Sequence, residues 1–242
     1  MGLRNCLTSP KGRLMKAFRR AAVASLVSVV VMPSLGGCAT PTTMGEQEQW
    51  QDIVLRHENV IQNLDKDTPE NAKLKEFMGR FDVLRGMPFE EILLEVDRSV
   101  DIFITYASDR KTFDSRDYWA TPVEMLKDMK GDCEDFATLK YYVLRYLGVP
   151  ADKMAIAVVG TGGGKLNHAT LLVDIRPEPG PGDSFRPGIR HVIFNGMREG
   201  FVMLDNDDKG ELKPAKGTGF KPHYSMNENG AWKGDTRPAP NW

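Results

Sequence analysis

The residues best suited to chemistry lie in the segment Gly131-Asp132-Cys133-Glu134-Asp135, where a cysteine stands among carboxylates at the expected start of a helix. His168 follows in strand-like sequence, and Asp205 closes a second strand-like run. A thiol attacks as its thiolate, a histidine can take its proton, and an aspartate can orient the imidazole. Cysteine, histidine and aspartate in this chain order therefore predict a nucleophile, a base and an orienting group.

Two choices underlie this assignment. Among the four histidines, His168 alone lies inside an apolar strand-like run and follows a Gly162-Gly163-Gly164 loop that can border a cleft. From the residues alone, a structural or surface histidine remains the alternative. Asp205 is favoured over Asp174 because Asp174, six residues along the strand of His168, would lie about 20 Å from it. A carboxylate at the end of a neighbouring strand can instead accept the second imidazole N–H.

The carboxylates beside the cysteine oppose its ionisation. A helix N-terminus stabilises a thiolate, but Asp132, Glu134 and Asp135 would raise the thiol pKa unless something neutralised them. The imidazolium of His168 is one candidate, and a hard cation such as Ca²⁺, which selects carboxylate oxygens, is the other. Zinc is disfavoured because a single cysteine without a second Cys or His nearby lacks the usual ligand spacing.

Residues 1–37 have the pattern of a lipoprotein signal peptide. They contain six basic residues, no acidic residue and an apolar run of about 15 residues, fewer than the ~20 that span a bilayer. Cys38 directly follows Leu-Gly-Gly and resembles a lipobox cysteine, which predicts cleavage before Cys38 and lipidation of its thiol. An ordinary signal peptide with a nearby cysteine is the alternative. Residues 39–45 are then a short tether.

The mature chain has the size and charge of one acidic domain. Removal of residues 1–37 leaves 205 residues, enough for a sizeable core. It also leaves 26 basic residues against 33 acidic ones, a net charge of −7, which argues against nucleic-acid binding. Only Cys38 and Cys133 remain, so no disulfide is expected within the domain. An unpaired thiol in an oxidising compartment favours a catalytic role.

Helices are expected first and strands afterwards, which predicts a single α+β domain over residues 46–242 with N-terminal helices packed on an antiparallel sheet. Apolar periodicity and proline-containing caps predict helices over 46–65, from Pro69, from about Pro88, from Pro122 to a stop at Gly131, and over 132–147. β-rich runs predict strands over 154–159, 167–175, 191–194 and 200–204, with a loop over 176–187. From about residue 207 the chain is expected to be irregular.

Four motifs in order resemble those of the bacterial transglutaminase-like cysteine proteinases, whose best-understood type is the LapG-like periplasmic adhesin protease. They are Asp117-Tyr118-Trp119-Ala120-Thr121-Pro122, then Gly131 to Ala137 with Lys140-Tyr141, then Asn167-His168-Ala169, then Leu204-Asp205-Asn206. The resemblance covers about Glu46 to Asn206. It implies a papain-like, transglutaminase-core fold, a Cys133–His168–Asp205 triad, and calcium dependence with Asp132 and Glu134 as ligands.

The resemblance also implies a biological role. In such enzymes the substrate is a large surface adhesin, cut near its N-terminus so that the cell leaves a biofilm, and a membrane-bound sensor of a cyclic dinucleotide restrains the protease. The spacing from His168 to Asp205 is longer than in that type, and a soluble periplasmic protease is the simpler family picture. With Cys38 lipidated, Ala39 after the cysteine favours an exported protein on the periplasmic side of the outer membrane, at its inner leaflet.

Three functions follow as hypotheses. The first is a calcium-dependent cysteine endopeptidase that works through a thioester. The second is a transglutaminase- or amidase-type acyl transfer, because the triad does not determine whether water or an amine reaches the thioester. The third is a non-catalytic, lipid-anchored binding protein on the same fold. Its usual sign is a missing triad member, and all three members are present.

Overall fold

The computed structural model describes residues 45–161, 165–177, 200–206 and 212–233. In chain order the elements are α2 (Glu46–Gln62), α3 (Pro69–Gly79), the 3-10 helix η1 (Arg80–Leu84), α4 (Phe89–Phe103), β1 (Thr105–Tyr106), α5 (Asp109–Thr112), α6 (Pro122–Asp128), β2 (Lys130–Gly131), α7 (Cys133–Leu147), the 3-10 helix η2 (Ala151–Lys153), β3 (Met154–Thr161), β4 (Lys165–Asp174), β5 (Phe201–Leu204), β6 (Lys213–Pro214), β7 (Lys221–Asn227) and β8 (Gly230–Lys233). The expected signal peptide, Cys38, the strand over 191–194 and nearly all of the loop over 176–187 lie outside the described residues.

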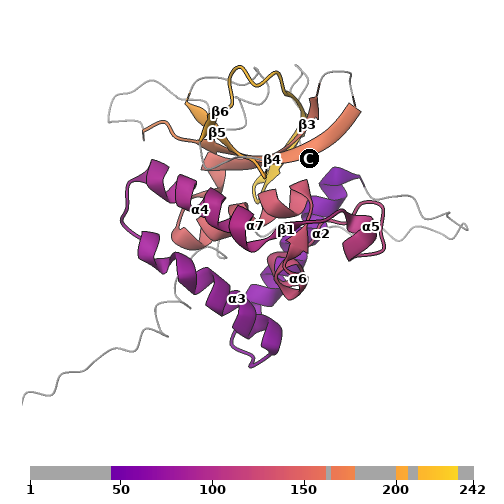
Figure 1. Cartoon of the computed structure of the whole chain (residues 1–242), viewed down its shortest axis with the longest axis vertical. Helices are drawn as coiled ribbons and strands as arrows, with labels where there is room; N and C mark the ends of the chain where they lie inside the picture. Colours follow the sequence, from indigo (N-terminus) through magenta and orange to yellow (C-terminus); the bar gives the residue numbers. More distant parts are fainter. Residues whose placement is uncertain (1–44, 162–164, 178–199, 207–211, 234–242) are drawn as a thin grey trace, which may run out of the picture.

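The molecule has two layers. One antiparallel sheet, in the order β6-β5-β4-β3-β7-β8, lies over a layer of helices, with α7 directly beneath it (Figure 1). The short strands β1 and β2 form a separate parallel pair. This architecture confirms the predicted α+β class with helices on an antiparallel sheet. No helix in the described ranges is long and apolar enough to cross a membrane.

The sheet buries both of its faces, as alternation along β3 shows. Ile156 and Val158 belong to the large core shared with the helices, whereas Ala155 and Ala157 belong to a smaller cluster on the opposite face. This separation follows from the period of two along a strand. Helix α7 is buried along almost its whole length, because the sheet covers one side and the other helices cover the rest. The nucleophile candidate is therefore carried by the most enclosed helix of the fold.

The local signals for helix starts are confirmed. The Thr68 side chain accepts a hydrogen bond from the Asn71 N–H at the start of α3. Thr121 and Glu124 form the expected capping box of α6, with a proline as its first residue. The end of α6 differs from the prediction, because the helix stops at Asp128 and Met129 adopts the left-handed conformation at φ 54°. Gly131 is not the helix stop.

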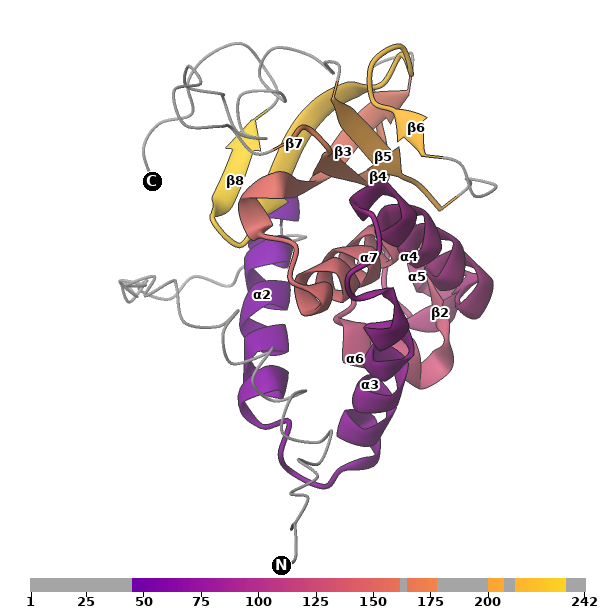
Figure 2. The same ribbon diagram turned by 90° about the vertical axis from the view of Figure 1, so that its left-hand side faces the viewer.

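The irregular tail predicted from about residue 207 is wrong for residues 213–233. Strand β7 pairs with the central strand β3, with Met226 opposite Ile156, and β8 pairs with β7. Pro222 sits where the β3–β7 register shifts, the kind of position at which a sheet tolerates proline. The glycine, proline and lysine content of this segment therefore predicts an irregular chain where a strand forms. Figure 2 shows α2 rising toward this end of the sheet, where the Trp50 indole N–H donates to the Asn227 carbonyl at 3.1 Å.

Candidate active site

The start of α7 is built around a close backbone approach. Gly131 pairs with Tyr106 across β1 and β2, and a Cβ at position 131 would lie 2.6 Å from Asp135 Cβ, so no larger residue fits. The buried Asp135 carboxylate accepts from the Ala120 N–H at 2.7 Å and from the Asp132 N–H at 3.2 Å. These bonds join α7 to the segment before α6. They place Cys133 in the first turn of α7, as predicted.

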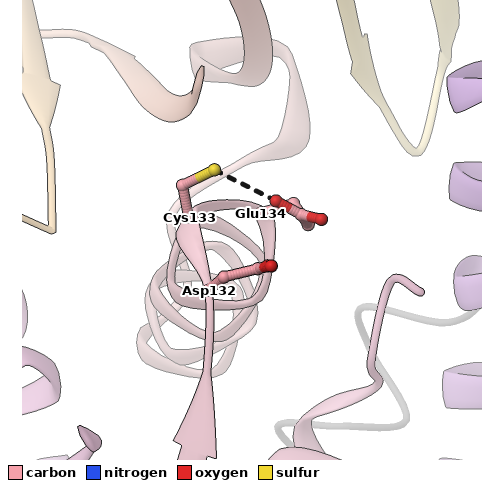
Figure 3. Close-up of side chains that lie close together, drawn as sticks. All are labelled: Asp132, Cys133 and Glu134. Carbon is pink, nitrogen blue, oxygen red and sulfur yellow. Dashed lines mark hydrogen bonds between the residues drawn. The ribbon is translucent and has the colours of Figure 1, made fainter. Parts of the chain in front are cut away.

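The Cys133 thiol lies between a carboxylate and the strand that carries His168. Its Sγ donates to Glu134 Oε2 at 3.0 Å, and the side chains of Asp132 and Glu134 extend to the same side of the helix start (Figure 3). The backbone N–H of Ala169, the residue after His168, also bonds to the sulfur and favours the thiolate. Burial, followed by the charge of Glu134, nevertheless raises the pKa of the Cys133 thiol well above its ordinary value.

His168 and Asp205 form a hydrogen-bonded pair across neighbouring strands. His168 Nε2 lies 2.6 Å from Asp205 Oδ1, and the Asn206 N–H donates to the same oxygen at 2.8 Å. The antiparallel pairing of β4 with β5 brings the two residues together, as expected. Asp205 is buried and His168 is partly exposed. An ionised Asp205 would hold the proton on Nε2, which makes Nδ1 the nitrogen that can accept a proton.

A cluster of acids larger than the predicted pair adjoins the thiol. Potential ligand atoms of Asp109, Asp132 and Asp135 lie within 4.8 Å of one another, and so do those of Asp109, Asp117 and Glu134. Oδ1 of Asp109 and Oδ1 of Asp132 are buried and have no hydrogen-bond partner among the described residues. Oxygen donors with unsatisfied lone pairs at this spacing suit a hard cation, and they fit calcium better than zinc.

Burial and mutual repulsion shift the ionisation of these acids. Desolvation, followed by the charge of Asp132, raises the pKa of Glu134 to about 10. Desolvation likewise raises the pKa of Asp109 to about 6, against a hydrogen bond from the Tyr118 N–H that favours its ionised form. The pKa of Asp132 is also raised, chiefly by desolvation. A group of carboxylates this close is costly to ionise without a positive charge among them.

The sequence pointed to three acids of the cluster, Asp132, Glu134 and Asp135, but gave no prediction for Asp109 and Asp117. Asp109 lies in the short helix α5, more than 20 residues before the cysteine, and no spacing pattern connects it to Asp132. Asp117 is the first residue of the motif that continues to Pro122, whose Trp119 is buried in the core. Its place in that motif was the one available signal.

Comparison with known proteins shows what this chain is similar to. Residues 83–179 match the family model of the bacterial transglutaminase-like cysteine proteinases. The fold is similar to three solved structures of Legionella pneumophila LapG, namely a calcium-bound form, an EGTA-treated form and one further form. Each is 26% identical at a TM-score of 0.51 and covers 76% of this chain, with 86%, 84% and 86% of the LapG chain covered in turn. No curated protein sequence matches.

Proposed function

We propose that this chain, a transglutaminase-like cysteine protease in fold and enzyme class, is a calcium-dependent endopeptidase of the cell envelope that cuts a large surface adhesin and so controls biofilm attachment. The observation that carries the catalytic assignment is the 2.6 Å contact between His168 Nε2 and Asp205 Oδ1. This pair lies on the strand whose next residue, Ala169, contacts the Cys133 sulfur. A histidine that contacts a buried acid, on the strand beside a thiol at a helix N-terminus, supports this assignment.

The reaction follows from the roles of these groups. His168 Nδ1 takes the thiol proton, and Cys133 Sγ attacks the carbonyl carbon of the scissile peptide. Backbone N–H groups at the start of α7 stabilise the oxyanion of the tetrahedral intermediate. The imidazolium then gives its proton to the leaving amine, the C–N bond breaks, and a thioester remains on Cys133. Water, deprotonated by the same imidazole, releases the acid and regenerates the thiol.

Calcium dependence is supported by the acid cluster and by the LapG structures, one of which is calcium-bound and another EGTA-treated. In this chain Asp132 and Glu134, together with Asp109 and Asp117, would hold the ion. When bound, the ion supplies positive charge that offsets the carboxylates opposing thiolate formation.

Location and partners are proposed from the sequence. The lipoprotein-type pattern of residues 1–37 supports export and lipidation of Cys38, which would place the enzyme on the inner leaflet of the outer membrane. A surface adhesin anchored in that membrane would be within reach. An inhibitory membrane-bound sensor of a cyclic dinucleotide is the proposed regulator, by similarity to LapG-like proteases.

The test is cleavage of the N-terminal region of a co-encoded large adhesin by the wild type and by Cys133→Ala, each with calcium and with a chelator. We expect discrete fragments from the wild type with calcium and intact substrate in the other three reactions. Cleavage by Cys133→Ala would contradict the nucleophile assignment, and undiminished cleavage in chelator would contradict the metal requirement. Cross-linked products with an added amine, without fragments, would favour acyl transfer.

The calcium site has its own test in thermal unfolding of Glu134→Gln. Because the pKa of Glu134 is raised to about 10, the glutamine resembles the protonated acid, and the variant should be at least as stable as wild type in chelator. Calcium should raise the unfolding temperature of the wild type by several degrees and that of the variant much less. The matched control is Asp128→Asn, an exposed carboxylate outside the cluster, which should keep the full calcium response. Equal calcium responses in Glu134→Gln and wild type would contradict the site.

A further inference from the structure

A fully buried lysine beneath the candidate triad has a use that the catalytic steps do not include. Lys140, in α7, has no exposed side-chain surface. Its Nζ lies 2.6 Å from Asp97 Oδ1, 2.8 Å from Asp101 Oδ1 and 2.9 Å from the backbone carbonyl oxygen of Asp205. The ammonium group donates hydrogen bonds to Asp97 Oδ1 and to the Asp205 carbonyl oxygen, and its third close contact, with Asp101, is an ion pair. The lysine is therefore held in one position.

Lys140 lies on the same side of α7 as Cys133. Lys140 follows Cys133 by seven residues, which is almost two helical turns, so both side chains leave the same side of the helix. Its two ion-pair partners, Asp97 and Asp101, belong to α4 and neutralise its charge, a requirement for any buried cation. The third partner, a backbone carbonyl, is different, because it belongs to the residue whose carboxylate contacts His168. One side chain thus connects the helix of the nucleophile to the backbone of the orienting acid.

We propose that Lys140 is a positioning residue that fixes Asp205, and through Asp205 the imidazole of His168, relative to Cys133. The inference deepens the proposed function, on whose assignment of His168 as the base it rests. Asp205 is the first residue after β5 and lies outside the strand ladder, so strand pairing alone does not hold its backbone. Loss of the Lys140 ammonium group would leave the Asp205 carbonyl free to move. Displacement of that peptide moves Oδ1 away from Nε2, and the imidazole loses its orientation.

The experiment measures alkylation of Cys133 by iodoacetamide at neutral pH with calcium, in the full chain with Cys6 and Cys38 replaced by serine. Cys133 is then the only thiol. His168→Ala gives the rate of a thiol without its base. Lys140→Met alone would bury two uncompensated carboxylates, so the test variant is Lys140→Met/Asp97→Asn/Asp101→Asn. A second, Lys140→Met/Asp97→Asn, keeps only Asp101, whose side chain is partly exposed. Circular dichroism confirms that each is folded.

The matched control removes another ion pair of α7 that does not touch the triad. Arg145 binds Glu228 at 2.9 Å, joining α7 to the turn between β7 and β8. Arg145→Met/Glu228→Gln should lose stability and keep the wild-type alkylation rate, which separates positioning from general loosening of the fold.

We expect both Lys140 variants to be alkylated about tenfold or more slowly than the wild type and to approach the His168→Ala rate, because displacement by even 1 Å costs an active site heavily. A folded Lys140 variant with the wild-type rate would overturn the positioning role, and so would an equal loss of rate in the Arg145 control. Equal rates in the wild type and His168→Ala would instead refute the base assignment on which the proposed function rests.

Discussion

The His168 Nε2–Asp205 Oδ1 contact joins two residues that lie 37 positions apart along the chain. Asp205 offers a buried carboxylate oxygen that also accepts the Asn206 N–H, so the acceptor is fixed before the imidazole binds it. An imidazole held in this way keeps its proton on Nε2, which leaves Nδ1 to accept the thiol proton. The orientation of the imidazole should therefore depend on an acceptor oxygen at position 205.

This dependence predicts an order among two substitutions. Asp205→Asn keeps an oxygen that can accept the Nε2 proton and should lose less activity than Asp205→Ala. Asp205→Ala removes the acceptor and should lower kcat on the order of a hundredfold or more with little change in KM. Steady-state kinetics on one adhesin-derived substrate measures both. Equal losses in the two variants, or an Asp205→Ala enzyme within twofold of wild type, would count against the orienting role.

Residue types and chain order sufficed to predict the His168–Asp205 pair, because both end or occupy recognisable strands that antiparallel pairing can bring together. The acid cluster was predictable only where it touches Cys133. Asp109, in α5, and Asp117, between α5 and α6, join Asp132 and Glu134 through tertiary contacts that have no local sequence signature. Lys140 could be recognised as part of a motif, but its three polar partners come from distant segments.

The site depends on how the short strand β2 leads into α7. Gly131 allows the Asp135 side chain to lie against the backbone, and Asp135 then ties the Asp132 and Ala120 N–H groups together. The caps of α3 and α6 were predictable because a few adjacent residues supply them. Strand β7 was not predictable, because its place inside the sheet comes from pairing with β3 and not from its own composition.

Substitution by alanine should have opposite effects on stability at Gly131 and at Gly79. Gly131→Ala would bring a Cβ within 2.6 Å of Asp135 Cβ and 2.9 Å of Met125 Cε, and should destabilise the fold by about 1–3 kcal/mol while lowering activity. Gly79→Ala, at the end of α3, meets nothing within 4 Å and should be neutral or stabilising by up to about 1 kcal/mol. Urea unfolding measures both free energies. Similar values for the two variants would contradict the close approach at Gly131.

At the scale of the whole molecule, α2 is held to the rest of the domain through buried polar and aromatic contacts. The ring of His57 lies 3.7 Å from that of Tyr142 in α7, measured between centroids, and His57 Nδ1 is buried without a hydrogen-bond partner among the described residues. Burial lowers the pKa of His57 to about 3. The histidine stays neutral in the folded state at pH values where the unfolded chain binds a proton.

This difference predicts a pH dependence of stability with a definite sign. The neutral His57 costs nothing above the ordinary pKa of 6.5, and stability falls as the pH drops below that value toward about 3. His57→Phe keeps a ring against Tyr142 and removes the titration. Between pH 6.5 and 5 the free energy of unfolding of the wild type should fall faster than that of the variant, by up to about 1.4 kcal/mol per pH unit. Urea unfolding curves whose pH dependence is parallel in the two proteins would contradict this account.

The most direct test of the central claim, that Cys133 forms a covalent acyl-enzyme during peptide cleavage, is intact-mass spectrometry of the enzyme after rapid acid quenching of its reaction with the adhesin fragment in calcium. We predict an adduct with the mass of the N-terminal cleavage product, located on the peptide that contains Cys133, and its disappearance on treatment with hydroxylamine. Cleavage that proceeds without any adduct, with Cys133→Ala as active as the wild type, would contradict the claim.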